Sequence, residues 1–115
     1  MYSLKIILLE NCFYSDELKK ILSKKPLNKI PVIYIIIKEE DKIKYKNDDI
    51  STFPQVYMIK KKSNGKLLIG GCDDTKKLIE IIQHNKKMNT VNSLISKIYP
   101  LWSEKAKLRL IELFS

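Results

Sequence analysis

Residues 52–57, with the sequence TFPQVY, constrain the fold of this chain most strongly. Val56 and Tyr57 favour a pleated backbone, so the segment predicts a turn that leads into a strand. Pro54 stands where that strand would begin, a position at which a sheet tolerates the missing N–H group. The sequence therefore fixes both a strand and the residue at which it starts.

A second motif, GGCDD, occupies residues 70–74. The glycine pair is expected to end a strand, and Asp73 or Asp74 to cap the helix that follows. That helix is predicted over about residues 75–85, where leucine and isoleucine recur at helical spacing.

The order of the earlier elements predicts a parallel pair of strands. Residues 4–9 form an apolar run typical of a strand buried on both faces, and residues 32–38 predict a second buried strand rich in β-branched residues. Residues 16–24 between them show helical spacing, with acidic residues first and lysines last. A short strand–helix–strand crossover implies parallel strands joined by a right-handed connection.

The remaining segments complete an α/β chain. Residues 39–50 are polar and predict either a short helix or an irregular loop. Residues 55–61 and 66–69 predict a β-hairpin around a turn at Ser63, Asn64 and Gly65. Residues 90–115 predict two short amphipathic helices interrupted by Pro100, and we expect a four-stranded mixed sheet with helices on both faces.

These motifs, with Cys12 between the first strand and the first helix, resemble the glutaredoxin family over residues 3–85. The resemblance implies a thioredoxin-like four-stranded mixed sheet flanked by helices, with an extra C-terminal helical segment. We accordingly expect a glutaredoxin-like domain over residues 1–88 and a helical extension over residues 89–115 packed on it.

The sequence CFYS at residues 12–15 is similar to the glutaredoxin CPYC motif. A helix N-terminus favours a thiolate at Cys12, and a thiolate attacks disulfide sulfur. Ser15 replaces the second cysteine, so the resemblance implies a one-cysteine cycle: Cys12 takes glutathione from a mixed disulfide, and a second glutathione releases it. Ser15 is expected to donate a hydrogen bond to the Cys12 thiolate.

Several residues depart from the family pattern. Leu9 stands where many members have a lysine, and Phe13 replaces a proline or glycine. Three nearby acids disfavour a thiolate: Glu10, Asp16 and Glu17. A buried structural cysteine is therefore the alternative role for Cys12.

The resemblance further implies that glutathione, as cosubstrate, lies between the two motifs. A cis Phe53–Pro54 bond would turn the Phe53 backbone toward the tripeptide. The N–H groups of Cys72 and Asp73 suit a carboxylate, and Asp73 or Asp74 could pair with the ligand's amine or simply cap the helix. The predicted glutathione-binding residues are Tyr14, Phe53, Pro54, Gln55, Gly71, Cys72, Asp73 and Asp74.

Some of these residues have plainer alternatives. Gln55 could reach either the ligand or only a neighbouring strand. Cys72 is expected to be a small loop residue rather than a second nucleophile, and His84 a residue near a helix end rather than an acid–base group. One histidine and two cysteines are too few for a dedicated metal site.

The composition limits the classes of partner that this chain is expected to bind. The net charge is +9, yet only one of the 22 basic residues is an arginine, the usual reader of bases. We therefore expect solubilising lysines rather than a nucleic-acid interface. Neither a membrane span nor a signal peptide is visible, so we expect a cytoplasmic protein. The residue usage would suit a large DNA virus or a parasite, and a viral origin would place the protein in the virion or the host cytoplasm.

The leading functional hypothesis is a glutathione-dependent thiol–disulfide oxidoreductase acting on glutathionylated or disulfide-containing proteins. The main alternative is a catalytically weak or inactive thioredoxin-fold assembly subunit, which would bind a protein partner or a second copy through residues 90–115. Binding of a [2Fe–2S] cluster with glutathione is less favoured, because CFYS lacks the glycine of the CGFS glutaredoxins. A nucleic-acid-associated protein is the weakest hypothesis.

Overall fold

The computed structural model describes residues 2–62 and 65–115. The chain forms two compact units, Met1–Thr75 and Lys76–Ser115, and the division falls inside helix α3 (Cys72–His84). This division comes earlier in the chain than the predicted boundary at residue 88. Packing of the helical extension on the first domain stays a prediction.

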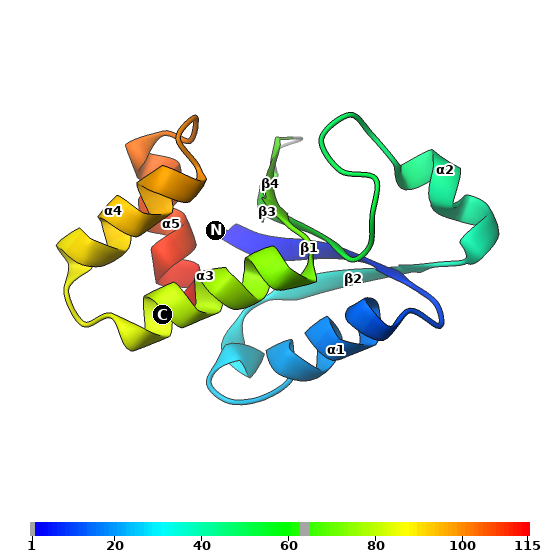
Figure 1. Ribbon diagram of the computed structural model, residues 1–115, viewed down its shortest axis with the longest axis horizontal. Coiled ribbons are helices and arrows are strands. Elements are labelled where there is room, and N and C mark those ends of the chain that lie inside the picture. The colour runs from blue at the N-terminus through cyan, green and yellow to red at the C-terminus, as the bar shows by residue number, and fades with distance from the viewer. Residues whose placement is uncertain (1, 63–64) are drawn as a thin grey trace. The chain divides into compact units, whose positions relative to one another are not determined.

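The first unit is built on a four-stranded mixed sheet in the order β2–β1–β3–β4 (Figure 1). β1 (Tyr2–Leu9) pairs in parallel with β2 (Val32–Ile37) and antiparallel with β3 (Gln55–Lys60). β4 (Lys66–Gly70) pairs antiparallel with β3. The α/β class and the thioredoxin-like arrangement predicted from the sequence are confirmed.

β1 is one of the two inner strands, and its second half is buried on both faces, as predicted. Leu4 and Ile6 are fully buried and project to one face, because side chains alternate along a strand. Residues from three strands and the turn before β3 gather on the other face. These residues, here called the Phe53 cluster, are Ile7, Leu9, Ile37, Phe53 and Tyr57.

β2 departs from the expectation of a buried strand. It lies at the edge of the sheet, and the side chains of Ile33 and Ile36 are 52% and 57% exposed. A run of β-branched residues favours a strand but does not say whether a second strand will cover its outer edge. Strand order, not local pattern, decides this.

Both helices of the predicted βα units begin earlier than expected. α1 (Phe13–Leu22) starts directly after Cys12, and Leu18 and Leu22 bury its inner face. α3 starts at Cys72 rather than near residue 75. A single 3-10 turn, η1 (Leu27–Lys29), precedes β2.

The polar segment at residues 39–50 contains a 3-10 turn, η2 (Glu39–Asp41), followed by the one-turn helix α2 (Lys42–Tyr45). This resolves the ambiguity between a short helix and a loop in favour of a short helix. Strands β3 and β4 confirm the hairpin. Its predicted turn includes Ser63 and Asn64, which lie outside the described residues.

The second unit contains two amphipathic helices beyond α3, as predicted. α4 (Met88–Ile98) and α5 (Glu104–Phe114) are separated by a segment that contains Pro100. Lys107 on α5 is 5% exposed, and its Nζ donates to Ser96 Oγ at 2.8 Å and to Glu104 Oε1 at 2.6 Å. The hydrogen bond from Lys107, and then its charge, hold the pKa of Glu104 below the ordinary value.

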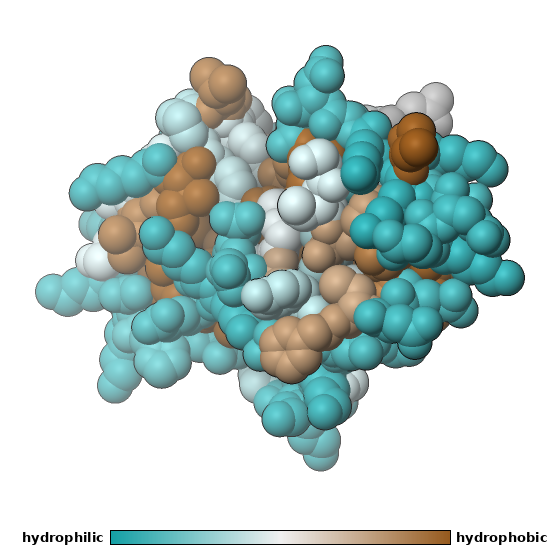
Figure 2. All heavy atoms as spheres, turned by 45° about the vertical axis from the view of Figure 1, so that its right-hand side comes forward, coloured by the Kyte–Doolittle hydropathy of each residue, from teal (hydrophilic) through white to brown (hydrophobic). Residues whose placement is uncertain are grey.

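Hydrophilic side chains cover most of the face seen in Figure 2, with smaller apolar patches between them. Within the part of the chain that the structure describes, every helix is too short or too polar to cross a bilayer.

The Lys107–Glu104 pair predicts an acid-dependent loss of stability. Because the pKa of Glu104 is lowered in the folded chain, its contribution is present above the unfolded-state pKa and is lost as pH falls through the folded-state pKa. The free energy of unfolding, measured with urea between about pH 7 and pH 3, should therefore fall less steeply with decreasing pH for Glu104→Gln than for the wild type. Glu112→Gln is the control, because the side chain of its partner Arg109 is 42% exposed, whereas that of Lys107 is buried. Identical slopes for Glu104→Gln and the wild type would contradict the prediction.

Candidate functional site

A hollow of about 280 Å³ lies in the first unit, where the first turn of α1, the turn before β3 and the start of α3 come together. It is called the Gly71 hollow here. Its lining residues are Tyr14, Thr52, Phe53, Gly71, Cys72, Asp73 and Asp74. The structure thus brings together all of the predicted glutathione-binding residues except Pro54 and Gln55. Thr52 was not among the predicted site residues, although it belongs to the TFPQVY motif.

Pro54 borders the Gly71 hollow through its backbone. The Phe53–Pro54 peptide bond is cis, as the resemblance implied. A Cβ atom built on Gly71 would lie 3.6 Å from the Pro54 carbonyl oxygen. The absence of a side chain at Gly71 therefore leaves open the space above the proline turn.

Asp74 shapes the loop that carries Gly71. Its Oδ2 accepts a hydrogen bond from the Gly71 N–H group at 2.9 Å, while the Thr75 N–H and hydroxyl groups donate to the Gly71 carbonyl oxygen. An acidic residue at the third position of a helix that accepts from the N–H group of the residue before the helix supplies one half of a capping box, and Gly71 has no side chain for the other half. The capping role is confirmed for Asp74. Asp73 is exposed at the rim of the hollow.

Cys12 lies between β1 and α1, as predicted, and is the N-cap residue of α1. Its backbone is extended, with φ −107° and ψ 122°, and its side chain makes no capping hydrogen bond. The side chain is partly buried against the Phe53 cluster and is not among the residues that line the Gly71 hollow. Cys12 is thus two residues from Tyr14 in sequence and packs against the cluster that contains Phe53.

Ser15 is fully buried, and its Oγ accepts a hydrogen bond from the Leu9 N–H group at 3.0 Å. This bond ties the end of β1 to the first turn of α1. Donation of a hydrogen bond from Ser15 to Cys12 stays a prediction. The sequence does not reveal this structural role, because the partner of Ser15 is a backbone N–H group.

Gln55 is also fully buried, and its amide serves a network away from the Gly71 hollow. Its Nε2 donates to the Tyr45 carbonyl oxygen at 2.9 Å, and its Oε1 accepts from the Tyr57 hydroxyl at 3.0 Å. The Tyr57 oxygen in turn accepts from Asn47 Nδ2 at 3.3 Å. The side chain of Gln55 therefore anchors α2 to β3.

Cys72 is 5% exposed, and its Sγ makes a long contact of 3.9 Å with Glu17 Oε2. Acidic groups therefore dominate the site, because Asp73 and Asp74 line the hollow and Glu17 approaches Cys72. None of the lining residues is basic. The groups available to an anionic ligand are backbone N–H groups in the first turn of α3, which have no acceptor within the helix.

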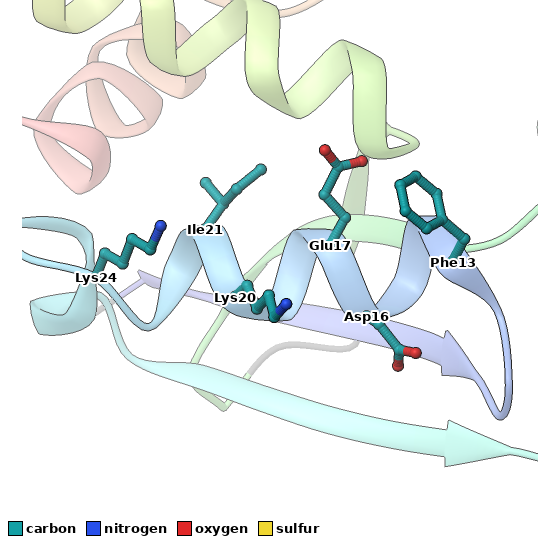
Figure 3. Close-up of a pocket in the computed structure, with 6 residues that line it drawn as sticks. All are labelled: Phe13, Asp16, Glu17, Lys20, Ile21 and Lys24. Carbon is teal, nitrogen blue, oxygen red and sulfur yellow. The ribbon is translucent and has the colours of Figure 1, made fainter.

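A second hollow, of about 480 Å³, follows α1 and is lined by Phe13, Asp16, Glu17, Lys20, Ile21 and Lys24. Figure 3 shows Phe13, Glu17 and Ile21 projecting on the same side of the helix, with Asp16 and Lys20 directed elsewhere. Phe13 is 72% exposed at the end of α1 next to Cys12. Neither cysteine is among the residues that line this hollow.

Comparison of the chain with protein-family models, with curated proteins and with solved structures found no match. The site is therefore interpreted from its own geometry and from the motifs already described. Across residues 2–62 and 65–115, no cluster of three or more His, Cys, Asp or Glu side chains could hold a metal ion.

The loop before α3 predicts a contrast between its two glycines. Gly70 has φ +136°, and an added Cβ would lie 2.6 Å from the Asp74 Cβ and Cγ atoms, whereas Gly71 has only ordinary contacts. Gly70→Ala should lower the free energy of unfolding by about 2 kcal/mol or more. Gly71→Ala should cost about 1 kcal/mol or less, as a changed N-cap residue. Urea denaturation followed by circular dichroism measures both, and equal losses would show that the loop is not held as described.

Proposed function

We propose that this chain is a glutaredoxin-like, glutathione-dependent thiol–disulfide oxidoreductase that acts through Cys12 alone. One observation carries the proposal: the Gly71 hollow is lined by residues that the resemblance assigns to glutathione, drawn from three separated segments of the chain. Both cysteines are free thiols, which suits the reducing cytoplasm as the setting.

The Gly71 hollow suits a short peptide with one ammonium and two carboxylate groups. The open space over Gly71 and Pro54 admits the peptide backbone. Backbone N–H groups in the first turn of α3 would hold a carboxylate, since no basic side chain lines the hollow. Asp73 is the better partner for the ammonium group, because Asp74 already accepts from the Gly71 N–H group.

The proposed cycle balances with glutathione as the only reductant. The Cys12 thiolate attacks the glutathione sulfur of a protein–glutathione mixed disulfide, forms a new S–S bond, and releases the protein thiolate. A second glutathione thiolate then attacks the sulfur of glutathione bound to Cys12. Oxidised glutathione leaves and the Cys12 thiolate is restored. No second protein cysteine takes part, which is consistent with serine at position 15.

Measurements of enzymatic turnover distinguish the roles of the two cysteines. Cys12→Ser should abolish glutathione-dependent reduction of a glutathionylated peptide, whereas Cys72→Ser should keep about half or more of the activity, because Cys72 supplies shape rather than a nucleophile. The measurement is the rate of oxidised glutathione production in a coupled assay. Activity that survives Cys12→Ser but disappears with Cys72→Ser would reverse the assignment of the nucleophile.

Binding separates the two aspartates. Asp73→Asn should weaken binding of S-methylglutathione by about tenfold, the worth of one hydrogen bond to a charged group. Asp74→Asn, unlike Asp73→Asn, should lower the free energy of unfolding, because Asp74 caps the loop. Calorimetric titration and urea unfolding of both variants test this pair. Unchanged affinity in Asp73→Asn would remove the aspartate from the ligand site.

A non-catalytic assembly subunit is the second candidate. Cys12 lies outside the lining of the Gly71 hollow, and in the second unit Leu101 is 97% exposed and Leu108 45% exposed. Exposed apolar side chains of this kind suit a protein partner. Absence of turnover in the wild type, together with a stable complex that Leu101→Lys disrupts, would favour this candidate.

A further inference from the structure

The outer edge of β2 is the surface outside the Gly71 hollow that most clearly suggests a binding partner. The carbonyl oxygens of Pro31 and Ile37 accept hydrogen bonds from Leu4 and Glu10, at the two ends of the β1 pairing, both at 2.9 Å. Because backbone groups alternate in direction along a strand, the odd-numbered residues of β2 face β1. The N–H and C=O groups of Val32, Tyr34 and Ile36 therefore face the free edge.

β2 lacks the features with which proteins usually protect an edge strand. Residues 32–37 have the sequence VIYIII, which contains no charged residue and no proline. Its side chains are also available, because Ile33 on one face and Ile36 on the other are each more than half exposed. An uncharged edge with unpaired backbone groups is a template for another strand.

We propose that β2 pairs antiparallel with β2 of a second copy of this chain, with Tyr34 opposite Tyr34 of the second copy. In this register Val32 lies opposite Ile36 of the second copy, and Ile36 opposite its Val32. All three edge-facing residues then belong to hydrogen-bonded pairs, which gives about six hydrogen bonds across the two-fold axis. The two sheets join into one continuous sheet.

The side chains fit the same register. Ile33 lies opposite Ile35 of the second copy on one face, while Ile36 lies beside Val32 of the second copy on the other. Both exposed isoleucines thus gain apolar neighbours. A register centred on Ile35 would instead pair Val32 with Lys38 of the second copy, beyond the end of the strand, and would form fewer hydrogen bonds.

A second copy can dock despite the net charge of +9, because this register sets no two lysines of the strand ends opposite each other. Lys38, which follows β2, lies opposite Ile30 of the second copy rather than opposite another lysine. Lys19 Nζ lies 5.6 Å from the ring centroid of Tyr34, so this register brings the two Lys19 side chains toward the axis. At physiological ionic strength the Debye length is about 8 Å, which screens exposed charges of this kind.

The edge lies apart from the Gly71 hollow, since no residue of β2 lines it. The proposed dimer is therefore independent of the proposed function. Each can fail without the other.

The test is the mass of the full chain in solution, measured by sedimentation equilibrium at about 0.15 M salt up to about 100 μM protein. The wild type should be a dimer. Ile36→Lys should weaken dimerisation at least tenfold while the circular dichroism spectrum is kept, because the side chain is exposed in the single copy. Leu101→Lys, also at an exposed apolar residue, should leave the dimer unchanged.

A cross-link tests the register. In a Cys12→Ser, Cys72→Ser background, Tyr34→Cys should form a disulfide-linked dimer on mild oxidation, because residues in a hydrogen-bonded pair have Cα atoms about 5.5 Å apart. Lys38→Cys, at an exposed residue beyond the strand, should not. A monomeric wild type, a dimer broken by Leu101→Lys but not by Ile36→Lys, or polydisperse aggregates would each overturn the proposal.

Discussion

The burial of β1 on both faces is the constraint on which the first unit depends. β1 has a parallel neighbour on one side and an antiparallel neighbour on the other, so its end at Leu9 and the beginning of β3 at Gln55 lie at the same end of the sheet. β4 ends there too, because Gly70 pairs with Val56. The first turn of α1, the proline turn and the GGCDD loop therefore lie together at the carboxyl end of β1. Open α/β sheets commonly bind ligands at this end of their parallel strands.

The fold class and most elements could be predicted because they are written in local patterns. Apolar runs mark β1 and β3, and helical spacing on either side of Pro100 marks α4 and α5. The starts of α1 and α3 were placed too late, because Cys12 and Gly71 are not among the most strongly preferred N-cap residues. The edge position of β2 depends on which strand lies beside it, and no local pattern records that.

The residues of the candidate site also fall into two groups, those that the sequence predicts and those that it does not. The motifs identify most of the residues that line the Gly71 hollow. They can do so because the glycines and the capping aspartate of the loop before α3 are neighbours in the sequence. The side chains of Ser15 and Gln55 were harder to place, since their partners are the Leu9 N–H group and the Tyr45 carbonyl oxygen. Backbone partners carry no residue identity, so a sequence does not reveal them. The net charge of +9 also gave no guide to the hollow, whose charged lining residues are both acidic.

The network around Gln55 bears on how this chain could be re-engineered. Tyr45 and Asn47 come from the segment before β3, whereas Gln55 and Tyr57 belong to the strand itself. The Gln55 amide bonds the Tyr45 carbonyl oxygen and the Tyr57 hydroxyl, and that hydroxyl also accepts from Asn47. A chimaera that replaced the α2 segment alone with one of a different backbone path would bury the Gln55 amide without its acceptor. Residues 45–57 are therefore best transplanted as one cassette, and insertions are better directed to the exposed end of η2.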